Sequence, residues 1–270
     1  MSAPAGIGEP SNYFPQLFAL LRRSAKQLVR PPSHSRRAEA ARRLARHTLL
    51  ATAVVGAAII ALMFVLDARE IALMPPRGTP DLWPVRILTD FGKDIYVMAV
   101  LAAMLLAVAI MAPLRSGTSK FRLLGFGTRI QFLFFAVLTS VIVGELIKWI
   151  AGRGRPFVGG KANAFNFEPF VGTEAHASFP SGHAITAFAL AFAVAAVWPR
   201  ARVVILAYAI LIAATRLVLL AHHPSDVVAG ALVGFIGVMF VRYWFAARRL
   251  AFAIRGDGAI LPLTGRRRGA

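Results

Sequence analysis

Residues 130–148 read IQFLFFAVLTSVIVGELIK, a run in which the first charged side chain, Glu145, comes only near the end, followed by Lys148. A helix needs about 20 predominantly apolar residues to cross the hydrocarbon core of a bilayer. Runs of similar length and composition recur along the chain, with approximate limits at 48–66, 95–113, 183–199, 202–221 and 226–245. The sequence therefore predicts an all-α, polytopic membrane protein with six transmembrane helices.

The composition agrees with this class. Hydrophobic residues make up 57% of the 270 positions and the mean hydropathy is +0.64, whereas ordinary soluble domains are about 45–50% apolar. The net charge of +19 is explained first by topology, since cytoplasmic loops collect Lys and Arg, and second by attraction to anionic lipid head groups. Nucleic acid is not an expected partner, because no soluble basic domain could carry it. Cysteine is absent, which excludes disulfides and thiolate chemistry.

The charges also predict an orientation. Basic residues gather before the first run, between the second and third, after the fourth and after the sixth, whereas the opposite connections hold most of the acids, including Asp67, Asp90, Asp94, Glu168 and Glu174. By the positive-inside rule both termini are cytoplasmic, and in a bacterium the other connections are periplasmic. Three regions follow: a basic cytoplasmic segment at 1–47, with an arginine-rich helix at 22–46; a six-span domain at 48–245; and a basic, disordered cytoplasmic tail at 246–270.

Residues able to carry chemistry fall into three clusters in the outward connections. They are Lys148-Trp-Ile-Ala-Gly-Arg153-Gly-Arg155-Pro156, Phe179-Pro180-Ser181-Gly182-His183, and Thr215-Arg216 with His222-His223-Pro224-Ser225-Asp226. Lys148, Arg155 and Arg216 provide three cations, and an arginine inside a span needs an anion or a polar cavity. Ser181 and the backbone of Gly182 add donors at the N-terminus of a helix, which favours anions. The clusters therefore predict a site for a tetrahedral oxyanion.

The histidines suit two different tasks. Asp226 follows His222 by four residues and can face it on a helical turn, and an imidazole oriented by a carboxylate is a nucleophile or a base. His183 could protonate a leaving oxygen. A metal ion held by His183, His222 and Asp226 is the alternative, but the neighbouring cations would repel it.

Three further residues near these clusters have simpler explanations. Arg153 is interpreted as an anchor at the membrane interface, and His223 as a neighbour of the site. Glu145 either pairs with Lys148 at i,i+3 or tunes the site, and both readings stay open.

In order and spacing, the clusters resemble the signature of the type 2 phosphatidic acid phosphatase (PAP2) superfamily: K-x6-R-P, P-S-G-H and S-R-x5-H-x3-D. The resemblance covers about residues 48–245. Thr215 replaces the usual serine of the third motif, Leu220 a common small residue and Gly154 a frequent proline. No charged or catalytic group of the pattern is missing.

The resemblance implies a membrane-embedded phosphatase of lipid phosphates or diphosphates that needs neither metal nor cofactor. It implies that phosphate is bound by Lys148, Arg155, Ser181, Gly182 and Arg216. His222 would attack phosphorus while Asp226 holds its other nitrogen, and His183 would protonate the departing oxygen. Water would then hydrolyse the phosphohistidine, on the outer face of the membrane.

The motifs contact only phosphate and do not choose among substrates. Undecaprenyl diphosphate, phosphatidylglycerol phosphate, phosphatidic acid and a lipid A phosphate all remain open, as does the oligomeric state. Alternatives to hydrolysis are a lipid phosphotransferase, a vanadate-dependent haloperoxidase, and a lipid-binding or transport protein without catalysis. The six spans argue against the haloperoxidase, since enzymes of that kind are usually soluble.

Overall fold

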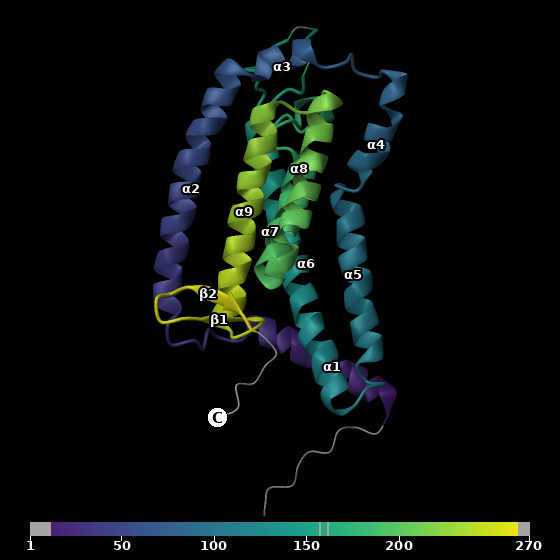
Figure 1. Cartoon of the computed structure of the whole chain (residues 1–270), viewed down its shortest axis with the longest axis vertical. Coiled ribbons are helices and arrows are strands. Elements are labelled where there is room, and N and C mark those ends of the chain that lie inside the picture. The colour runs from purple at the N-terminus through teal and green to yellow at the C-terminus, as the bar shows by residue number, and fades with distance from the viewer. Residues whose placement is uncertain (1–11, 157, 161, 264–270) are drawn as a thin grey trace, which may run out of the picture.

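The computed structural model describes residues 12–156, 158–160 and 162–263. Its long helices stand side by side in a bundle (Figure 1). The helices are α1 Tyr13–Val29, α2 Arg37–Val65, α3 Asp67–Leu73, α4 Trp83–Asp90, α5 Asp94–Met111, α6 Gly117–Ala151, α7 Gly182–Val197, α8 Arg202–Val218 and α9 Pro224–Ala247. Short 3-10 turns are η1 Pro80–Leu82, η2 Glu174–His176 and η3 Pro199–Ala201, and the strands are β1 Phe252–Ile254 and β2 Ile260–Pro262.

The prediction of an all-α polytopic membrane protein is confirmed. Within the described residues, five helical segments are long and apolar enough to cross a membrane: Arg37–Val65, Pro80–Met111, Gly117–Ala151, Pro199–Val218 and Pro224–Ala247. The remaining predicted span is α7, which is apolar but shorter. It lies in the interior of the bundle, where the side chains of Ala187, Ala189 and Ala191 are fully buried.

Close contacts of α9 with its neighbours set the position of the site. A Cβ atom at Gly234 would lie 2.9 Å from the backbone nitrogen of Ala189 on α7, and one at Gly237 would lie 2.2 Å from Oγ of Ser140 on α6. Small residues at such crossings let helix backbones approach closely in a membrane. These contacts hold α9 against α6 and α7. The end of α6 carries the first motif, the start of α7 the second, and the start of α9 the His222–Asp226 part of the third, whereas Arg216 lies on α8.

The helix predicted at 22–46 is broken in the structure. Residues 30–36 separate α1 from α2, and they contain Pro31 and Pro32. Proline removes a helical N–H donor and disfavours helical backbone in the residue before it, so the chain turns here. α1 runs across one end of the bundle (Figure 1), where the Tyr13 hydroxyl donates to the carbonyl of Ile110 at 3.0 Å.

The C-terminal region is more ordered than predicted. Strands β1 and β2 form an antiparallel hairpin that pairs Phe252 with Pro262. The ring of Phe252 is fully buried and packs edge-on against Phe132 of α6, with centroids 4.8 Å apart. Apolar side chains that can reach the core outweigh the Gly and Arg content that suggested disorder. The rest of the predicted tail, 264–270, lies outside the described residues, as do positions 1–11 of the basic segment.

Candidate active site

The end of α6 aims the first motif at the site. Gly152 has a φ of 53° in the left-handed region, and a Cβ there would lie 1.8 Å from the carbonyl oxygen of Glu168. Only glycine meets both conditions without strain. The helix stops at this residue, which leaves Lys148 on its last turn and starts the loop that contains Arg153 and Arg155.

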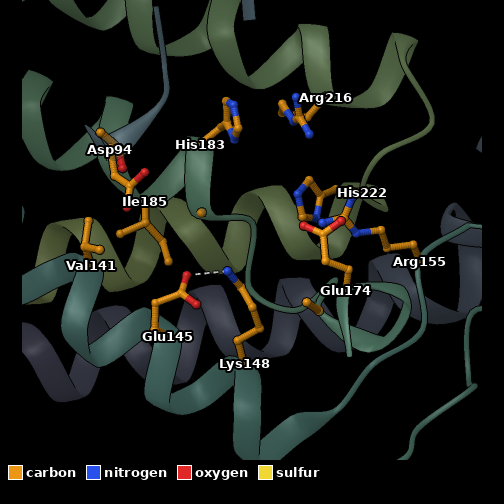
Figure 2. A pocket seen from close by; sticks show the side chains of 13 residues that line it. Asp94, Val141, Glu145, Lys148, Arg155, Glu174, His183, Ile185, Arg216 and His222 are labelled. Atoms are coloured by element: carbon orange, nitrogen blue, oxygen red, sulfur yellow. Dashed lines mark hydrogen bonds and ion pairs between the residues drawn. The ribbon is translucent and has the colours of Figure 1, made fainter. Parts of the chain in front are cut away.

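A cavity of about 250 Å³ lies where these ends meet. Figure 2 shows side chains from several elements pointing into it. Six residues predicted for the site line this cavity: Lys148, Arg155, Gly182, His183, Arg216 and His222. The three cations and both histidines of the prediction are thus brought together from α6, the loop after it, α7, α8 and the turn before α9.

The other two predicted site residues, Ser181 and Asp226, are not among the residues that line the cavity. Both are fully buried, and the backbone nitrogen of Ser181 donates to the carbonyl of Asp226 at 3.0 Å. The Ser181 hydroxyl is buried and has no hydrogen-bond partner within the described part of the chain.

His222 is held in the form that a nucleophile needs. Its Nδ1 lies 2.8 Å from the carbonyl oxygen of Ser178, and because a carbonyl can only accept, Nδ1 carries the proton and Nε2 keeps its lone pair. Burial, followed by the positive charges of Arg216 and Arg155, lowers the pKa of His222 well below its ordinary value. The imidazole is therefore neutral over the physiological range of pH.

Asp226 does not hold the second nitrogen of His222 as the resemblance implied. The distance from its Oδ2 to Nδ1 is 3.9 Å, beyond a hydrogen bond. The carboxylate is already occupied: it accepts from the Ser178 hydroxyl at 2.6 Å, from the backbone of His223 at 2.8 Å and from Arg153 at 2.6 Å. Ser178 therefore links the two residues, since its hydroxyl contacts Asp226 and its carbonyl contacts His222.

Two of the cations have side-chain partners within the protein. Lys148 donates to Glu145, which is the first of the two readings left open for Glu145, and Glu145 also lines the cavity. Arg216 is 8% exposed and donates to the hydroxyl of Thr89 on α4 at 2.8 Å. The ring nitrogen Nε2 of His183 is buried and has no hydrogen-bond partner among the described residues. The cavity thus keeps donor capacity that its own walls do not use.

The interpretation of Arg153 as an interfacial anchor is wrong. Its side chain is completely buried and forms ion pairs with Asp226 at 2.6 Å and with Asp67 at 2.8 Å. Two carboxylates from distant parts of the chain compensate the cost of removing the guanidinium from water. His223 is also fully buried beside the site and lines no part of the cavity, in agreement with its interpretation as a neighbour.

The profile of the PAP2 superfamily matches residues 130–250, the region that contains all three motifs. A lipid A 1-phosphatase of Rhizobium johnstonii is 34% identical over 204 residues, which cover 74% of this chain and 82% of that protein. The chain belongs to the PAP2 superfamily. The lipid A 1-phosphatase of Rhizobium etli is 32% identical over 197 residues, 73% of this chain and 84% of that protein.

The bacitracin transport permease protein BcrC of Bacillus licheniformis is 26% identical over 170 residues, 60% of this chain and 79% of that protein. No solved structure matches the chain. With membership of the PAP2 superfamily shown, the predicted class of enzyme, a membrane phosphomonoester hydrolase, is confirmed.

Sequence reasoning missed several residues of this PAP2 site. Asp94 and Glu174 line the cavity, together with Glu145, for which the sequence had left a role in the site open. Thr89 and Asp67 reach the site from connections outside the matched region. Asp67, Asp94 and Glu174 all lie in the acidic connections on one side of the predicted spans, which was a signal that they could lie near the site. Sequence spacing could not show that these connections fold over the site.

One departure from the PAP2 pattern has a backbone explanation. Leu220 has a φ of 47°, in the left-handed region where side chains with a Cβ are strained. A small residue, glycine above all, fits this position more easily. The leucine side chain is almost completely buried two residues before His222, so its packing offsets the strain at the turn that carries His222.

The predicted absence of a metal remains a prediction for this PAP2 protein. Among the described residues, no group of three or more His, Cys, Asp and Glu side chains lies close enough together to hold a metal ion. Three cations surround the histidines instead, and they suit an anionic ligand.

Proposed function

We propose that this PAP2 protein hydrolyses a lipid phosphomonoester through a phosphohistidine on His222, without a metal ion. One observation carries the proposal: two histidines and the cations Lys148, Arg155 and Arg216 line a single cavity at one end of the bundle. Fixed cations around a transferring phosphoryl group stabilise the charge of its transition state, which is the role that a metal would otherwise fill.

The reaction divides into two steps. Nε2 of His222 attacks phosphorus, the bond from phosphorus to the lipid oxygen breaks, and His183 gives its proton to that oxygen. Water then attacks the phosphohistidine, His183 takes a proton from it, and the phosphorus–nitrogen bond breaks. The products are a lipid alcohol and inorganic phosphate. Ser181 and the N-terminus of α7 add donors to the phosphate oxygens.

For the substrate we propose the 1-phosphate of lipid A, because the two Rhizobium relatives carry that activity in their names. Phosphatidic acid, phosphatidylglycerol phosphate and undecaprenyl diphosphate are the comparison substrates. The name of the Bacillus relative favours transport as a second candidate, but a transporter has no need for two histidines beside a phosphate site.

The purified protein in detergent should release phosphate from lipid A 1-phosphate faster than from the other three lipids, with excess EDTA present throughout. Orthovanadate should inhibit, because it mimics five-coordinate phosphorus. The measurement is free phosphate against time for each lipid. Loss of all activity in EDTA with recovery on adding a divalent ion would contradict the cationic site, and preference for another lipid would contradict the proposed substrate.

We also propose that both termini are cytoplasmic and that the cavity opens on the outer, periplasmic face. The asymmetry of Lys and Arg between alternate connections supports this orientation. Topology reporters fused after residues 75 and 165 should report the outer side. Reporters fused after residue 114, between α5 and α6, and at the C-terminus should report the cytoplasm. An inward signal at 165 would move the site to the cytoplasmic face and overturn the proposed orientation.

A further inference from the structure

Asp67 is a fully buried carboxylate that no motif contains. It is the first residue of α3, and α3 lies across the same end of the bundle as the loops of the site (Figure 1). Its Oδ1 accepts from the backbone nitrogen of Ser225 at 3.0 Å, and its Oδ2 accepts from the Ser225 hydroxyl at 2.5 Å. Asp67 therefore contacts the first turn of α9 directly, next to Asp226.

Arg153 joins Asp67 to Asp226. Its Nη2 donates to Asp67 at 2.8 Å and its Nη1 donates to Asp226 at 2.6 Å and to Ser225 at 2.6 Å. Nε and Nη2 also donate to the carbonyl of Ala164, at 3.1 and 2.6 Å. Every nitrogen of the guanidinium therefore has a hydrogen-bond partner, which fixes its orientation. The carboxylates of Asp67 and Asp226 are both completely buried.

The contacts continue to the nucleophile. Asp226 accepts from the Ser178 hydroxyl at 2.6 Å, and the carbonyl of the same residue accepts from Nδ1 of His222 at 2.8 Å. A continuous path of short contacts therefore leads from Asp67 through Arg153, Asp226 and Ser178 to His222. Every side chain along it is buried, so water cannot replace a contact that is lost.

We propose that Asp67 is a positioning residue of the active site, which acts through Arg153 to fix Asp226 and the turn that carries His222. The proposal rests on the proposed function of His222. Asp67 contributes a negative charge that shares Arg153 with Asp226. Without that charge, the guanidinium acts on Asp226 alone, and the carboxylate gives less support to His222 when the imidazole becomes positive during attack.

The competing explanation is that Asp67 only stabilises the fold, since losing one partner of a buried ion pair is strongly destabilising. The two explanations differ in kinetics. Replacing a residue that only stabilises the fold lowers the amount of folded enzyme and its melting temperature. Replacing a positioning residue lowers kcat of the folded enzyme and leaves KM nearly unchanged. They also differ in how the effects of two substitutions combine. If Asp67 acts through Arg153, replacing Asp67 should have little further effect on kcat once Arg153 has been replaced.

The test compares Asp67→Asn with Glu70→Gln, a matched control on the same helix. Glu70 is 4% exposed, and its carboxylate has no hydrogen-bond partner among the described residues. Burial, with added repulsion from Asp67 and Asp226, raises the pKa of Glu70 to about 7. At pH 6 this group is mostly protonated, so glutamine replaces one neutral group with another. The control removes a buried carboxyl from α3 and leaves the path to His222 untouched.

Phosphate release by each variant is measured at pH 6 in detergent, together with the melting temperature. Asp67→Asn should lower kcat by about 10–100-fold, as expected for losing the support behind a directly acting group, with KM within about twofold of the wild type. Glu70→Gln should stay within about twofold in both constants. In an Arg153→Met background, adding Asp67→Asn should change kcat by less than about twofold.

Ser225→Ala covers the case in which Asp67→Asn does not fold. It removes the hydroxyl that contacts both Asp67 and Arg153, and it should lower kcat several-fold with KM unchanged. Wild-type kcat in Asp67→Asn, an additive effect in the Arg153→Met background, or wild-type kcat in Ser225→Ala would each overturn the proposal. Because wild-type phosphate release is measured in the same experiment, these outcomes are distinct from a failure of the proposed function.

Discussion

Replacing His222 with alanine should remove phosphatase activity by more than about 10⁴-fold, the scale of losing a nucleophile. The hydrogen bond from its Nδ1 to the carbonyl of Ser178 leaves the lone pair of Nε2 free to attack. Lys148 and Arg216, which line the same cavity, are cations and cannot take over its role. Phosphate release from the lipid substrate is the measurement.

The binding of inorganic phosphate is the control for this variant. Lys148, Arg155 and Arg216 remain in place, so phosphate should still bind the His222→Ala protein, as measured by calorimetry in detergent. Turnover within a few fold of the wild type would show that another residue is the nucleophile. Loss of turnover together with loss of phosphate binding would place His222 in binding instead of attack.

Replacing His183 with alanine should reduce activity in a way that depends on the leaving group. General acid catalysis contributes about 10²–10⁴-fold, and an alkoxide or sugar oxygen needs its proton, whereas a phenolate hardly does. The loss should therefore reach that range for the lipid phosphate and be far smaller for an aryl phosphate. The measurement is kcat/KM for both substrates with each protein.

The control is the same pair of substrates with Lys148→Ala, which removes a cation that we propose binds phosphate. This variant should lose activity equally on both substrates, because phosphate is common to them. An equal loss on both substrates in His183→Ala would contradict its role as the acid and would assign it to phosphate binding.

Much of the fold can be predicted from the sequence, because a bilayer requires apolar segments of a fixed length. Apolar runs of spanning length predicted the helices, and fixed spacing within each motif predicted which side chains meet in the cavity. Both signals lie within short stretches of sequence, so a single sequence is enough to detect them. The break between α1 and α2 at Pro31 and Pro32 is an equally local signal, which the prediction of one helix at 22–46 did not take into account.

The remainder depends on contacts between distant segments. Arg153 looked like a surface anchor because its partners, Asp67 and Asp226, lie 86 and 73 residues away along the chain. His222 contacts the backbone carbonyl of Ser178, and a backbone contact cannot be predicted from the type of side chain at that position. The hairpin after α9 likewise depends on a place for Phe252 against Phe132, which composition does not reveal.

The central claim is that the phosphoryl group passes through His222, and trapping that intermediate tests it most directly. Lipid substrate labelled with ³²P in the scissile phosphate is mixed with the protein in EDTA and quenched within the first turnover. Label should appear on the protein that is stable to base and lost in acid, as phosphohistidine is, and it should be absent from His222→Ala. Label that persists in His222→Ala, or that survives acid, would contradict it.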